Sequence, residues 1–264
     1  MDFITTAIYF GIAATTVMFL FNIFHCVFAS IFEVRIEKFG MLLTIGSKYF
    51  LKFKRNHTEY SLGWIPTGSY VKIAGMFNEG LDIEPTKIEE YMLLSKSPIV
   101  RFICSAGAPL LLLIPFILSA SFIDSNGSLN DGFQVLNNVL YNIYQYLIGA
   151  IDVTQTETNW TAIANKYNEF PIILCLMTLF TAFTNITTLL TIAISEKIKG
   201  FYNISSIALI IFYLFICYKI IVLYFTLYGF IGGLTSFLKF SVTIYSISFI
   251  LMLLIKISPK NKYI

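Results

Sequence analysis

Five stretches of this chain are each long and apolar enough to cross a membrane as a helix. A membrane-spanning helix needs about 20 consecutive and mostly apolar residues. The composition agrees, because 57% of the 264 residues are hydrophobic and only 12% are charged, against roughly 25% charged residues in soluble domains. The sequence therefore predicts an all-α polytopic membrane protein, with one membrane domain over residues 1–264 and a first span within 1–32. The five expected spans are Ala7–Phe32, Pro98–Ile123, Pro171–Ser195, Phe201–Tyr228 and Ser236–Ile255.

Two segments between these spans have a pattern of their own. The loop 33–97 is too polar to cross a membrane, and within it 58–75 alternates β-branched and aromatic residues with polar ones between Gly and Pro, which predicts a β-hairpin. Residues 133–150 place apolar side chains on one helical face and Asn and Gln on the other. This pattern predicts an amphipathic helix that lies in the plane of the membrane interface.

The basic residues predict which way the spans run. Of the 18 Lys and Arg residues, ten lie between the first span and Arg101, two lie in the turn after the third span, and three lie in the C-terminal tail. Cytoplasmic loops carry the excess of Lys and Arg, so this side of the membrane is expected to be cytoplasmic. The N-terminus is then outside and the C-terminus inside.

The segment Thr58–Gly75 reads TEYSLGWIPTGSYVKIAG. It resembles the "TEYSL…IPxGGYVK(M/I)AG" segment of the site-2 protease family, the intramembrane zinc metalloproteases. Two flanking runs, 32–39 and 95–109, are similar to the family's "FGVRVEEF" and "SKPVWQRxxIxxAGP". The resemblance covers roughly residues 10–195. It implies the family's membrane core, and the short segment Asp124–Phe170 leaves no room for the PDZ domain that many relatives carry between the second and third spans.

In that family the hairpin dips toward the catalytic centre and pairs with the substrate as an added strand. A sheet edge offers backbone donors and acceptors that an extended chain can satisfy. The resemblance therefore implies partner-binding residues, and the alternative is that the hairpin is only a cytoplasmic cover. The implied residues are Thr58, Tyr60, Leu62, Pro66, Gly68, Tyr70 and Lys72 in the hairpin and Asn185 in the third span.

The family's zinc motif is incomplete in this chain. Relatives carry His-Glu-x-x-His on the first span, with two ligands on one helix face and a general base between them. Here the matching run is His25-Cys26-Val27-Phe28-Ala29, which keeps one ligand and replaces the base by Cys26 and the second ligand by Ala29. The position of the third ligand, an Asp in the family, is Ala193. Between Pro171 and Ser195 there is no Asp or Glu at all.

Other metal ligands are not expected. The four cysteines lie in apolar runs and are typical of small buried hydrophobes, although Cys104 and Cys175 leave an alternative zinc site open. His25 and Cys26 point about 100° apart on a helix and do not easily share one ion. A lone intramembrane histidine often marks a functional site, but we favour a remnant that is hydrogen-bonded to Asn22 or Thr16.

These observations favour a non-catalytic relative of site-2 protease, without zinc or another cofactor, that binds other membrane proteins as a scaffold, assembly or regulatory subunit. The alternatives are an active intramembrane zinc metalloprotease with atypical ligands and a structural subunit of a larger membrane complex. The expected surroundings are the lipid bilayer of a bacterial inner membrane and partner membrane proteins, with no nucleic acid.

Overall fold

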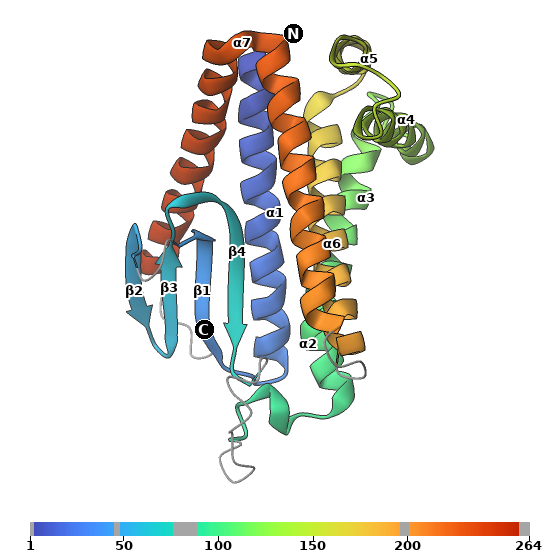
Figure 1. The fold of residues 1–264 in the computed structure, drawn as a ribbon. Helices are drawn as coiled ribbons and strands as arrows, with labels where there is room; N and C mark the ends of the chain where they lie inside the picture. The colour runs from blue at the N-terminus through green and yellow to red at the C-terminus, as the bar shows by residue number, and fades with distance from the viewer. Residues whose placement is uncertain (1–2, 45–47, 76–88, 196–200, 259–264) are drawn as a thin grey trace. The chain divides into compact units, whose positions relative to one another are not determined.

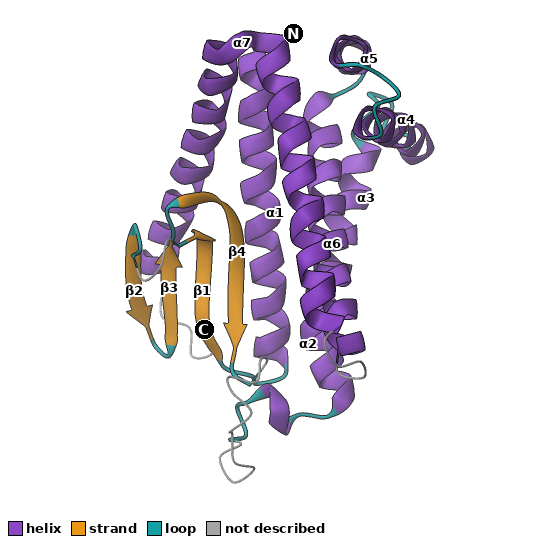
Figure 2. Ribbon diagram, viewed as in Figure 1, coloured by secondary structure: helices purple, strands orange, loops and turns teal. Residues whose placement is uncertain are grey.

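The computed structural model describes residues 3–44, 48–75, 89–195 and 201–258 of the chain. These residues form seven α-helices, a short 3-10 helix (η2, Leu93–Ser95) and one sheet (Figures 1 and 2). Four helices are long and apolar enough to cross a membrane, and they contain parts of all five predicted spans. The chain divides into two compact units: unit 1 holds Met1–Ala13 and Leu113–Val242, and unit 2 holds Ala14–Leu112 and Thr243–Ile264.

The predicted first and third spans are single helices. Helix α1 covers Phe3–Ile31 and helix α6 covers Glu169–Ser195. The second span is two successive helices, α2 (Pro98–Leu111) and α3 (Leu113–Ser121). Helix α2 begins where Ser97 accepts a hydrogen bond from the backbone N–H of Val100 and Pro98 occupies the first turn.

Helix α7 (Phe201–Ile257) holds both of the remaining predicted spans. It is bent at Gly229, where φ is 65° and ψ is 179°, a backbone conformation that glycine adopts without steric penalty. The side chain of Phe230 lies against that of Phe225 across the bend, with 5.7 Å between the ring centroids. A straight helix of this length, at about 1.5 Å per residue, would be far longer than the roughly 30 Å hydrocarbon core of a bilayer.

The β element is a four-stranded sheet, so the prediction of a hairpin over 58–75 is wrong. The strands are β1 (Ile36–Leu43), β2 (Leu51–Arg55), β3 (Thr58–Leu62) and β4 (Ile65–Ile73), and their order in the sheet is β2-β3-β1-β4. Strands β3 and β4 do not pair with each other. Both pair with β1, which is parallel to β3 and antiparallel to β4.

The crossing over the end of β1 explains this topology. Gly63 connects β3 to β4, and its N–H donates to the carbonyl of Met41 at 2.9 Å. A Cβ atom on Gly63 would overlap the backbone of Leu43, so only glycine allows the chain to pass this close to β1. The sequence predicts no strand where β1 lies. The local pattern of 58–75 therefore predicted that its two strands pair with each other, although both pair with β1.

The polar segment between the second and third spans is helical within unit 1. The predicted amphipathic helix is present as α4 (Leu129–Leu147), which begins at the N-cap Ser128. Leu136 and Val139 are buried in a cluster with residues of α3 and α6, whereas Leu140 and Tyr144 are exposed. A second helix, α5 (Val153–Lys166), was not predicted, because its sequence is polar; Asp152 caps it by accepting from the N–H of Gln155 at 2.7 Å.

Candidate functional site

His25, the one retained zinc-ligand position on α1, is buried and hydrogen-bonded to another helix. Its Nδ1 lies 3.1 Å from the carbonyl oxygen of Cys104 on α2, and the ring of Phe21 packs against it edge-on with 4.6 Å between centroids. The expectation that Asn22 or Thr16 holds His25 is therefore wrong. A carbonyl only accepts hydrogen bonds, so Nδ1 carries a proton. In the neutral ring Nε2 then keeps its lone pair, which is the tautomer of a histidine that binds metal through Nε2.

The other two positions of the motif on α1 are Cys26 and Ala29. Cys26 is buried and takes the place of the general base, and Ala29 is fully buried at the position of the second ligand. Ala29 instead takes part in the end of α1 through its backbone, because its carbonyl accepts from the N–H of Val34 at 2.7 Å. An alanine side chain has neither a lone pair for a metal nor a proton to move.

The residues expected from the third span lie on α6. Asn185 donates from Nδ2 to the carbonyl of Thr181 on its own helix at 2.8 Å, so its amide is bonded within α6. Ala193 belongs to the last turn of this helix. Asn185 and Ala193 belong to unit 1, whereas His25 belongs to unit 2.

The donor set does not fit zinc. A protein zinc site takes three or four His, Cys, Asp or Glu ligands around one ion. Among the residues that the structure describes, no three such side chains come together. Cys175, one of the two cysteines left open as alternative ligands, contacts the carbonyl of Phe116 in unit 1 at 3.5 Å.

The predicted partner-binding residues divide between two strands with different surroundings. On β3, Thr58, Tyr60 and Leu62 are buried. Thr58 donates from Oγ1 to the carbonyl of Ile36 at 2.8 Å, and the ring of Tyr60 stacks on that of Phe53 at 5.1 Å. Burial raises the pKa of Tyr60. These three side chains hold the sheet together and do not face outward.

On β4 the predicted residues are half-buried and lie at an edge of the sheet. Gly68 has a φ of +75° and lies against the side chain of Leu43. Tyr70 covers Gly40 of β1, and its hydroxyl lies 3.0 Å from Oγ of Ser61. Lys72 forms an ion pair with Glu37 at 3.0 Å. With Pro66, these residues shape the strand whose far side has no paired strand among the described residues.

Asn22 joins α1 to this strand, a role that the sequence analysis missed. Its Nδ2 donates to the carbonyl of Gly40 on β1 at 3.1 Å, and its Oδ1 accepts from Oγ of Ser69 on β4 at 3.2 Å. Asn22 is fully buried. The available signal was a polar side chain inside a long apolar run, which usually has a specific partner. Figure 1 shows β4 on the side of the sheet nearest α1.

The structure thus defines a class: an integral membrane protein in which a small sheet follows the first apolar helix and is hydrogen-bonded to it. Comparison with known families is consistent with this class. The sequence profile of peptidase family M50 matches residues 9–255, and the chain belongs to this family, the site-2 protease family. A search of curated proteins gives no significant match.

Proposed function

We propose that this chain is a non-catalytic member of peptidase family M50 that binds other membrane proteins as a scaffold, assembly or regulatory subunit. The proposal rests on the residue types that this chain has at the family's base and metal-ligand positions. The family's chemistry needs a metal held by several ligands and a base beside it. In this chain the base position is Cys26, and two ligand positions are Ala29 and Ala193.

The proposal includes the arrangement of the chain in the membrane. We infer five crossings, with the two limbs of α7 on either side of Gly229 as the fourth and fifth, and with α4 at the membrane interface. The segment between the second and third crossings forms α4 and α5, so we infer that it holds no PDZ domain. We infer from the basic loops that the N-terminus is outside and the C-terminus is cytoplasmic, and we propose that the membrane is a bacterial inner membrane.

Metal content tests the non-catalytic part of the proposal. We expect the full-length protein, purified in mild detergent without chelators, to carry far less than one zinc per chain by elemental analysis. The His25→Ala variant provides the comparison, because it removes the one family ligand that is retained. Stoichiometric zinc in the wild type that is lost in His25→Ala would overturn the proposal.

Partner binding is assigned to the edge strand β4. An extended segment of another protein pairs with an open sheet edge through its backbone, and β4 has only β1 as a paired strand among the described residues. Two of the predicted partner-binding residues on β4 have contacts within the sheet: Tyr70 contacts Ser61, and Lys72 forms an ion pair with Glu37. A strand that is fixed in this way loses little conformational freedom when a partner binds.

Site-specific crosslinking tests this assignment. We expect a photoreactive amino acid at Thr67, which is exposed on β4, to crosslink to membrane proteins in intact cells. The matched control is Lys54, which is exposed on the opposite edge strand β2. Equal crosslinking from both positions would contradict the assignment to β4. One stoichiometric product at Thr67 would favour a subunit of a defined complex, whereas several weak products would favour a binder of varied substrates.

An active metalloprotease with atypical ligands is the second candidate, and one observation favours it. The hydrogen bond from Nδ1 to Cys104 leaves Nε2 of His25 with the lone pair that a metal ligand needs. Cleavage of a single-span substrate by the purified protein, abolished by a chelator and restored by zinc, would establish this candidate in place of the non-catalytic one.

A further inference from the structure

Glu169, the first residue of α6, is a buried carboxylate that the candidate site does not use. Only 4% of its surface is exposed. Its Oε1 accepts two hydrogen bonds, from Oγ1 of Thr6 on α1 at 2.7 Å and from Nε1 of Trp160 on α5 at 3.2 Å. Its Oε2 is buried and has no hydrogen-bond partner among the described residues. All of these residues belong to unit 1.

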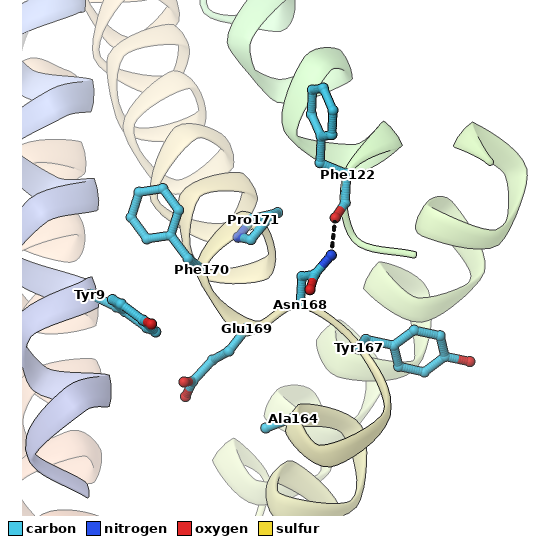
Figure 3. Close-up of a pocket in the computed structure, with 8 residues that line it drawn as sticks. All are labelled: Tyr9, Phe122, Ala164, Tyr167, Asn168, Glu169, Phe170 and Pro171. Atoms are coloured by element: carbon cyan, nitrogen blue, oxygen red, sulfur yellow. Dashed lines mark hydrogen bonds between the residues drawn. The ribbon is translucent and has the colours of Figure 1, made fainter. Parts of the chain in front are cut away.

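A buried carboxylate oxygen without a donor is unfavourable, because the group has lost water and gained nothing in exchange. Glu169 lines a cavity of about 420 Å³, which is within the range of small-ligand sites. Figure 3 shows its carboxylate between Tyr9 and Ala164, two other residues that line the cavity. Of the residues that line the cavity, Glu169 is the one with an acidic side chain.

The walls of the cavity favour a cation. Tyr9 and Phe170 line it together with Glu169, and their rings lie against each other with 5.6 Å between the centroids. The faces of aromatic rings attract cations, and a carboxylate adds a full negative charge. A primary ammonium carries N–H groups that can donate to Oε2, whereas a quaternary ammonium carries none.

We propose that this cavity binds the headgroup of an aminophospholipid such as phosphatidylethanolamine, with its primary ammonium at Oε2 of Glu169. A lipid is favoured over a lysine side chain of another protein because the cavity lies at the start of a helix long and apolar enough to span a bilayer. A residue that begins such a span lies near the level of the lipid headgroups.

Native mass spectrometry of the detergent-purified, delipidated full-length chain tests the site. We expect phosphatidylethanolamine to bind about tenfold more tightly than phosphatidylcholine, and the Glu169→Gln variant to lose this preference. Glutamine keeps an oxygen that can accept from Thr6 and Trp160 but has no negative charge. The matched control is Glu157→Gln on α5, which is expected to bind as the wild type does.

A second variant keeps the test decisive if Glu169→Gln does not fold. Ala164→Leu places a larger side chain at the cavity wall without removing either hydrogen bond to Glu169, and we expect it to lower phosphatidylethanolamine binding to the level of phosphatidylcholine. Retention of the preference in Glu169→Gln or in Ala164→Leu would overturn the proposal. So would saturation by a soluble lysine-containing peptide under conditions in which phosphatidylethanolamine does not bind, because the ammonium would then come from a protein.

Discussion

Replacing Gly132 by alanine is expected to destabilise the protein by about 1–3 kcal/mol, the usual cost of overpacking a buried contact. Gly132 lies in the first part of α4, where a Cβ atom would overlap the carbonyl oxygen of Ala120 on α3. That obstacle is backbone, so it does not rotate away as a flexible side chain does. Separating α3 from α4 would also loosen the cluster that buries Leu136 and Val139.

The direction of this effect is what makes it informative. In an unconstrained helix interior, glycine to alanine stabilises by roughly 0.5–1 kcal/mol, because alanine has the higher helix propensity. Thermal unfolding of the purified protein in detergent, followed by circular dichroism, measures the difference. Asn138→Ala, at an exposed position on the same helix, controls for helix propensity and is expected to leave the transition unchanged or slightly raised. A stabilised Gly132→Ala variant would show that α3 and α4 do not pack this closely.

Replacing Asn22 by leucine is expected to cost about 1–3 kcal/mol and to weaken partner crosslinking from Thr67. Leucine is similar in size but has no polar atom. The carbonyl of Gly40 then loses a donor, and the hydroxyl of Ser69 loses one of its two nearby acceptors, the other being the carbonyl of Met18 at 3.4 Å. Because Asn22 bonds to both β1 and β4, its loss releases the sheet from α1 at the strand proposed to bind partners.

Two measurements on the Asn22→Leu variant separate stability from binding. Thermal unfolding reports the loss of stability, and crosslinking from Thr67 below the transition temperature reports the position of β4. Asn137→Leu, an exposed asparagine on α4, is the matched control and is expected to change neither. Wild-type stability together with wild-type crosslinking in Asn22→Leu would contradict the role assigned to this residue.

Much of the fold could be predicted from local sequence, but the pairing of the strands in the sheet could not. The apolar runs predicted the membrane helices, and the alternation of polar and apolar residues found α4. The strands β3 and β4 were also placed nearly correctly, but their pairing was not. A period of two shows that a segment is extended and does not say which strand lies beside it. The partner, β1, lies more than 15 residues earlier in the chain and carried no recognised strand signal.

The candidate site was predictable as a set of positions and not as a set of contacts. The run His25–Ala29 and its missing carboxylate could be found by comparison with the family's motif. The carbonyl that holds His25 could not, because Cys104 is 79 residues away and acts through its backbone, which any residue type would supply. The hydrogen bond between Thr6 and Glu169 joins residues 163 apart, and no local pattern predicts it.

The sequence by itself determined that this chain is a membrane protein and that it is similar to the intramembrane metalloproteases. Lipid requires long apolar helices, which are a local property of the chain, and a motif is a matter of residue identity and spacing. Only the tertiary structure decided the order of the strands, the carbonyl that Nδ1 of His25 meets and the burial of one carboxylate oxygen without a donor. Each of these depends on which distant groups meet, because a buried polar atom is satisfied or left unpaired by its neighbours in space.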